Sequence, residues 1–103
     1  MKLYLVREDD DPRWVAALAN ERMYGYVANT GKFHDNNALR NDYYIDRDFS
    51  YEEIGPGEAR RLIDQGIGRL DEVEEAAMIA AWKADPRPLS VTDVLAMAAA
   101  SRN

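Results

Sequence analysis

The strongest constraint on how this 103-residue chain folds is a change of pattern at Ile54. Before Ile54, aromatic residues stand in short segments separated by polar turns, and seven of the ten aromatic residues lie within residues 23–51. After Ile54, alanine-rich segments follow one another with helix-capping residues at their ends. Aromatic residues favour strands, whereas alanine and capping residues favour helices. The sequence therefore predicts a single α+β domain over residues 1–103: a small, mostly antiparallel sheet of three or four strands within residues 2–54, with one face covered by about three helices within residues 56–102.

Three segments in the first half have the composition of strands. Residues 2–6 are rich in Leu, Tyr and Val, and the acidic run of residues 8–11 ends this strand because four acids in a row do not suit a sheet interior. Residues 23–34 predict a β-hairpin, because the Asn-Thr-Gly turn at residues 29–31 tolerates positive φ. Residues 47–54 predict a further strand.

Two other segments in the first half allow helices. Residues 13–21 fit either a helix with Asp11 as its N-cap or a strand. Their alanines favour the helix, and both alternatives stay open. Further along, Asp35 or Asn36 is placed to cap a short helix that carries Leu39.

Signals at the ends of segments predict three helices in the second half. The first begins at Pro56 and ends before Gly66, which supplies the left-handed residue of a Schellman closure. The second begins at Asp71 as N-cap, and its run of residues 76–82 is apolar on nearly every side, which predicts a central position. The third begins after Ser90, whose hydroxyl suits an N-cap.

The composition is that of an acidic globular protein without covalent cross-links. The absence of cysteine excludes disulfides and thiol chemistry. A net charge of −6, spread over both halves, opposes binding to nucleic acid or anionic membrane and favours a basic protein partner. No segment approaches the roughly 18 apolar residues of a membrane span, and residues 1–8 lack a signal-peptide pattern, so we expect a cytoplasmic protein. Ten of the thirteen basic residues are arginine and fifteen residues are alanine, a bias typical of GC-rich bacterial or phage genes.

The only histidine, His34, is the centre of an enzymatic alternative. Histidine is the usual general base near neutral pH, but the adjacent Asp35 points to the opposite face of a strand, so a carboxylate from residues 42–48 is needed to orient it. In this alternative, a small enzyme or ligand-binding domain uses His34 with Asp42 and Lys32. One histidine and no cysteine make a zinc site unusual, so we expect neither metal nor cofactor. The Gly-Lys pair in the hairpin turn lacks the spacing of a P-loop.

The aromatic residues within residues 23–51 are the preferred candidates for a binding surface. Tyrosine combines apolar area with a hydroxyl and is enriched at interfaces. We expect about four of these aromatics in the core and two or three exposed, with the hairpin tip at residues 29–32 in solvent. The predicted binding residues are Tyr24, Tyr26, Lys32, Phe33, His34, Tyr44, Asp46 and Asp48.

These observations predict a non-enzymatic, acidic protein-binding module, such as an immunity protein, an antitoxin or a phage-type inhibitor. Its partner is expected to be a basic protein that contacts a tyrosine-bearing acidic face. Nucleic acid and membrane are not expected partners. The oligomeric state and the identity of the partner stay open at this stage.

Overall fold

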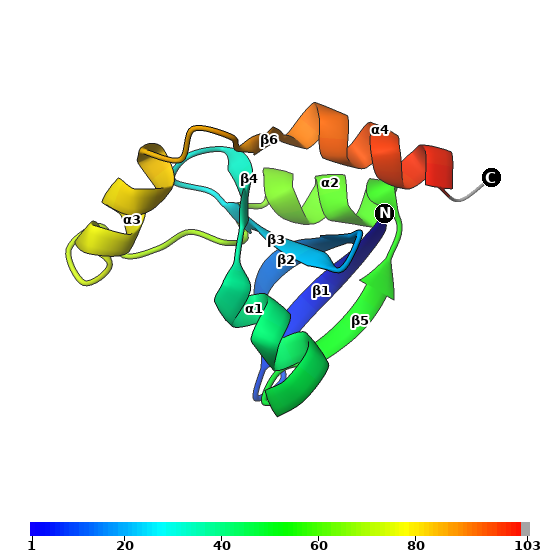
Figure 1. Ribbon diagram of the computed structural model, residues 1–103, viewed down its shortest axis with the longest axis horizontal. Coiled ribbons are helices and arrows are strands. Elements are labelled where there is room, and N and C mark those ends of the chain that lie inside the picture. Colours follow the sequence, from blue (N-terminus) through cyan, green and yellow to red (C-terminus); the bar gives the residue numbers. More distant parts are fainter. Residues whose placement is uncertain (102–103) are drawn as a thin grey trace.

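The computed structural model describes residues 1–101 and contains one six-stranded antiparallel sheet (Figure 1). The strand order is β5-β1-β2-β3-β4-β6. The strands are β1 (Lys2–Glu8), β2 (Asp11–Ala19), β3 (Arg22–Val27), β4 (Lys32–Asp35), β5 (Ser50–Ile54) and β6 (Leu89–Ser90). The helices are α1 (Asn37–Asn41), the π-helical turn η1 (Asp42–Asp46), α2 (Pro56–Asp64), α3 (Ala76–Lys83) and α4 (Val91–Ser101).

The predicted α+β class is confirmed, but two details of the predicted fold are wrong. The sheet has six strands instead of three or four, because β2 forms and β6 adds a strand from outside residues 2–54. The helices are not all C-terminal, since α1 and η1 lie between β4 and β5. The predicted end of the last helix, at residue 102, lies outside the described residues.

Residues 13–19 belong to strand β2 and residues 20–21 to the turn after it, so the preferred helix is wrong. Two-residue turns with positive φ flank this strand: Asp9-Asp10 at 50° and 68°, and Asn20-Glu21 at 51° and 66°. Two consecutive residues with positive φ match the twist of antiparallel strands. The chain from β1 to β3 is therefore a meander of tight hairpins, in which pairing with two neighbours outweighs the helix preference of three alanines.

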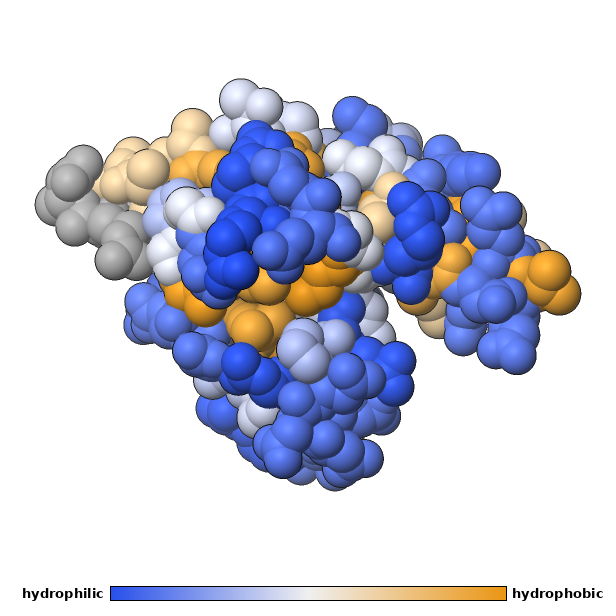
Figure 2. Space-filling model, turned by 180° about the vertical axis from the view of Figure 1, so that it is seen from behind, coloured by the Kyte–Doolittle hydropathy of each residue, from blue (hydrophilic) through white to orange (hydrophobic). Residues whose placement is uncertain are grey.

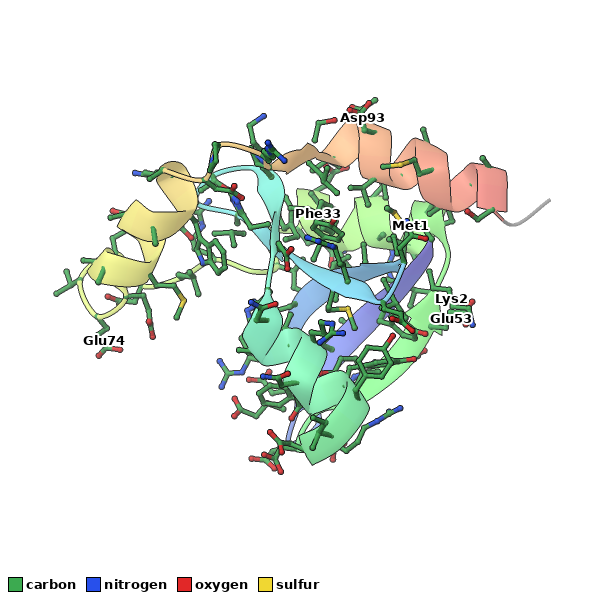
Figure 3. All side chains as sticks on the ribbon, in the orientation of Figure 1. Met1, Lys2, Phe33, Glu53, Glu74 and Asp93 are labelled. Carbon is green, nitrogen blue, oxygen red and sulfur yellow. The ribbon has the colours of Figure 1, made fainter. Side chains whose placement is uncertain are left out.

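The two faces of the sheet carry different side chains and different helices. Helices α2 and α4 pack on one face, against an aliphatic core with Phe33 at its centre (Figure 3). The core on this face includes Leu3, Leu5, Val15, Ala17, Phe33, Ile63, Val94 and Ala98. Helix α1 packs on the other face, against a smaller cluster of Tyr4, Val6, Ala16, Met23 and Leu39. Helices therefore cover both faces, whereas the sequence predicted one covered face.

Side chains at the helix ends form several of the predicted caps. The Asn36 side chain accepts a hydrogen bond from the Leu39 amide at 3.0 Å and starts α1. The Ser90 hydroxyl accepts from the Asp93 amide at 3.0 Å and starts α4. At the end of α2, the amide of Ile67 donates to the carbonyl of Leu62, and Gly66 has a φ of 92°. These local predictions hold because caps depend on residues only a few positions apart.

Helix α3 is peripheral, so its predicted central position is wrong. It belongs to a projecting segment, residues 69–88, which we call the α3 arm (Figure 1). Within α3 only Ile79 is buried. The arm leaves the body at Gly68, where φ is 83° and a Cβ atom would lie 2.6 Å from the carbonyl oxygen of Tyr26. The aliphatic face of the sheet is already covered by α2 and α4, so the apolar surface of α3 finds no place in the core.

Candidate functional site: an apolar groove beside acidic segments

The buried His34 fastens the α3 arm to strand β4. Its side chain is 1% exposed, and its Nδ1 lies 2.8 Å from a carboxylate oxygen of Asp85, at the end of the arm. Hydrogen bonds from the Arg87 amide, then from His34, lower the pKa of the Asp85 carboxyl. An ionised carboxylate only accepts hydrogen bonds, so Nδ1 carries a proton. The second ring nitrogen, Nε2, lies 2.7 Å from the Thr30 hydroxyl. Both ring nitrogens of His34 are therefore engaged inside the fold.

Two further contacts hold the arm against the β3–β4 hairpin. The Trp82 ring of α3 stacks on the His34 ring with a centroid distance of 5.1 Å. At the start of the arm, the Asn29 side-chain amide donates to the carbonyl of Leu70 at 3.1 Å and accepts from the Leu70 amide at 2.8 Å. Asn29 and Thr30 are half-buried because of these contacts, so only Gly31 and Lys32 of the predicted hairpin tip are exposed.

Between the α3 arm and α1 lies a groove of about 520 Å³, which we call the α1–α3 groove. Its floor is the face of strands β2 and β3. The large apolar side chains that line it are Trp14, Leu39, Phe49, Leu70, Met78 and Trp82. Leu39 is buried, Met78 is 46% exposed, and the other four are half-buried. Figure 2 shows the hollow between the α3 arm and the rest of the molecule, with apolar side chains beside it. This volume falls within the roughly 300–1,000 Å³ typical of ligand pockets.

The wall of the groove opposite α3 is held by a network around the buried Asp42. Its carboxylate accepts from the amide of Asp48 at 2.9 Å, the amide of Phe49 at 3.2 Å and the Tyr51 hydroxyl at 2.8 Å. Burial, then the hydrogen bond to Asp42, raises the pKa of Tyr51. The network fixes Phe49, whose ring contacts Trp14 edge to face at 5.4 Å. Asp42 therefore holds Phe49 in the groove wall, although Asp42 itself does not line the groove.

Tyrosines behind this wall pack together with one arginine. The rings of Tyr4, Tyr43 and Tyr51 lie 5.0–6.1 Å apart. The Arg47 guanidinium lies 4.6 Å from the Tyr43 ring centroid, a cation–π distance. These three tyrosines consequently support α1 and η1 and are not free for an interface.

The net charge of the protein comes from two segments that include the walls of the groove. Residues 35–53 carry six acidic and two basic side chains, and residues 69–87 carry five acidic and three basic ones. The remaining residues carry eight of each sign. The entire net charge of −6 therefore comes from these two segments, with Glu52 and Glu53 on β5 at the far edge of the sheet from the α3 arm. Glu74, for example, projects from the outer end of the α3 arm (Figure 3).

The structure separates the predicted binding residues into buried and exposed groups. Phe33 and His34 are fully buried and do not rim a surface, whereas Tyr26, which is 6% exposed, lines the α1–α3 groove. Tyr24 is half-buried and lies away from the α1–α3 groove. Lys32 is exposed on β4. The remaining three, Tyr44, Asp46 and Asp48, are exposed on and just after η1. Their neighbour Ile45 is 75% exposed, which gives the acidic segment an apolar residue as well.

The residues of the enzymatic alternative do not converge. His34 is bonded to Thr30 and Asp85, whereas Asp42 is bonded to two backbone amides and Tyr51. Catalysis needs a base within hydrogen-bond reach of a substrate. A histidine that is 1% exposed, with both ring nitrogens occupied, does not offer that reach.

Other site types find no support among residues 1–101. No group of three or more His, Cys, Asp or Glu side chains is placed to hold a metal ion there. Over the same residues, no helix has the length and apolar character needed to cross a membrane. No protein-family model, curated protein or solved structure matches the chain.

Sequence reasoning missed most of the residues that form the groove. Trp14 lies in a segment that fits either a helix or a strand, and Met78 and Trp82 lie in a segment that predicts a central helix. The one available signal was that both tryptophans lie in segments of small residues, where a large side chain stands out. Only their packing around His34 and Phe49 shows that they face one space.

Proposed function

We propose that this protein is a non-enzymatic binding module that contacts a basic protein through the acidic segments beside the α1–α3 groove. An immunity protein, an antitoxin and a phage-type inhibitor all act in this way. The observation that carries the proposal is the origin of the net charge: all of it comes from residues 35–53 and 69–87, the two segments that supply the walls of an apolar groove. A cytoplasmic location is part of the proposal.

The arrangement matches what a protein interface needs. Interfaces combine an apolar centre with a polar rim, and aromatic residues and methionine are enriched in the centre. Here half-buried Trp14, Phe49 and Trp82 line the groove with the exposed Met78, and the segments that form its walls carry a net negative charge. Acidic charge would mainly accelerate association with a basic partner, and apolar contacts would supply most of the affinity.

The test is to capture partners from the native host at low salt and then at raised salt, with wild type and with Asp46→Asn/Asp48→Asn. With the recovered partner, we expect the double variant to associate more slowly and with a flatter salt dependence, while dissociation changes little. In the same assay, Tyr44→Ala removes an exposed ring that serves as an interface anchor in this proposal. It should accelerate dissociation and weaken the binding free energy by about 1–3 kcal/mol.

A matched control removes the same charge from the opposite face. Asp64→Asn/Asp93→Asn alters exposed carboxylates on α2 and α4, and should leave association unchanged. Equal association rates for the two double variants would contradict the proposal. A small-molecule ligand that is lost on His34→Ala, with no protein captured, would instead support the enzymatic alternative.

A further inference from the structure

The strands beneath the α1–α3 groove restrict what can bind there. Its floor is formed by β2 and β3, which lie inside the sheet and pair with strands on both sides. Their backbone amides and carbonyls are therefore used within the sheet, and an incoming chain cannot add to it as a further strand at this place. An occupant has to bind through side chains that it presents to the floor.

The walls restrict the occupant further. One wall is α1 with Leu39, together with Phe49 just before β5, and the other is α3 with Met78 and Trp82. Six large apolar side chains face the space, so apolar groups are favoured at its centre. Residues 35–49, up to the start of β5, have a net charge of −2 and residues 69–87 also of −2, so basic groups are favoured on either side. The occupant is therefore apolar along one side and basic on its flanks.

We propose that the α1–α3 groove binds the apolar face of a basic amphipathic helix from the partner protein. Such a helix presents residues i, i+3, i+4 and i+7 on one face, spaced about 5–6 Å apart, and keeps its own backbone hydrogen bonds. Its apolar side chains contact Trp14, Phe49 and Met78, and its lysines and arginines face the two acidic segments. This inference rests on the proposed function, since it specifies how the basic partner binds.

The protein carries its own reporter of groove occupancy. Its only two tryptophans, Trp14 and Trp82, both line the α1–α3 groove. A helix that enters the groove removes water from their rings, so their fluorescence should change in a saturable way. A peptide held only by the outer acidic residues should leave this signal nearly unchanged.

The test titrates the full chain with a set of synthetic peptides of about 18 residues, long enough to form a helix. Each peptide contains Lys and Arg together with Leu, Ile, Phe or Met at i, i+3, i+4 and i+7. Control peptides have the same composition with the apolar residues scattered around the helix. We expect the amphipathic peptides to change tryptophan fluorescence and to bind at least tenfold more tightly than their scrambled controls.

Two matched methionine variants locate the binding site. Met78, in the groove, is 46% exposed, and Met97, on α4 at the opposite face, is 41% exposed. Both are partly in solvent, so Met78→Gln and Met97→Gln should each leave the fold intact. We expect Met78→Gln to weaken peptide binding about fivefold to tenfold and Met97→Gln to leave it unchanged.

Each alternative outcome overturns the inference in a recognisable way. Equal binding of amphipathic and scrambled peptides, or equal binding by the two methionine variants, would show attraction by charge alone. The protein would then still be a binder of basic partners, but the groove would not bind an amphipathic helix.

If no peptide causes a saturable fluorescence change, the groove is not a site for a helix. A doubled mass in light scattering, lost on Met78→Gln but kept in Met97→Gln, would show that a second copy occupies the groove. The proposed function fails separately, if the captured partner is indifferent to Asp46→Asn/Asp48→Asn.

Discussion

The two faces of the sheet share the same strands but are completed in different ways. On the α2 and α4 face, the core is made mainly of aliphatic side chains, with Phe33 and Tyr26, and its residues are buried. On the α1 and α3 face, the side chains are larger and more polar, and a groove of about 520 Å³ stays open. The first face is held by apolar burial. The second depends on the hydrogen bonds that the Asp42 carboxylate accepts and on those that the His34 ring makes.

This difference between the two faces assigns them different roles: one stabilises the fold and the other provides a surface for binding. Burial of aliphatic groups is the main favourable term in folding and needs no specific partner atoms. A buried polar group is stable only with its hydrogen bonds satisfied, and such networks fix a single arrangement. Here they fix the walls of the groove: Asp42 holds the segment that carries Phe49, and His34 holds the arm that carries Trp82. We therefore expect the closed face to control folding and the open face to control binding.

The largest effect is expected at the centre of the closed face. Phe33→Ala removes a fully buried ring and should lower the free energy of unfolding by about 3–5 kcal/mol, measured by urea denaturation. Phe33→Leu is the conservative control and should lose much less. A loss below about 1 kcal/mol in Phe33→Ala would contradict the assignment of the core to this face.

A smaller effect is expected from the network behind the groove wall. Asp42→Ala leaves two backbone amides and the Tyr51 hydroxyl without their acceptor and should cost about 2–3 kcal/mol. Asp42→Asn keeps one acceptor oxygen and should recover part of this loss. Amide hydrogen exchange should also accelerate at residues 47–49. Exchange that is unchanged there would mean that Asp42 does not hold this segment.

The attachment of the α3 arm should weaken in acid. The pKa of Asp85 is lowered in the folded state, so its contribution to stability is present above its unfolded pKa of about 3.9 and is lost as the pH falls through the folded value. The difference in unfolding free energy between wild type and Asp85→Asn should therefore be larger at pH 7 than at about pH 3. Asp64→Asn, on an exposed carboxylate, is the control. If the difference in unfolding free energy between wild type and Asp85→Asn does not vary with pH, Asp85 does not hold the α3 arm in place.

The smallest effect on stability is expected inside the groove. Met78→Ala removes a side chain that is 46% exposed, so the free energy of unfolding should change by no more than about 0.5 kcal/mol. The same variant should weaken peptide binding. A stability loss comparable to that of Phe33→Ala would show that the groove belongs to the folding core, and the comparison between the two faces would fail.

The sequence by itself determined the features that depend on near neighbours. Asn36 and Ser90 cap the helices that follow them, and Gly66 closes the end of α2. The hairpin at residues 23–34 forms around its turn, with Tyr26 paired to Phe33. The α+β class and the acidic charge also follow from composition and pattern. In each case the controlling residues lie within one turn of a helix or one hairpin, where local geometry fixes the outcome.

Only the tertiary structure decided which residues form the candidate site. The position of α3 could not be read from its apolar composition, because an exposed apolar helix and a central one have the same pattern. The partner of His34 is Asp85, 51 residues away, and not a carboxylate of residues 42–48. Trp14 and Trp82 lie 68 positions apart in the sequence, yet both line one groove. Contacts over such distances depend on how the sheet faces are shared among the helices, which is a property of the whole packed chain.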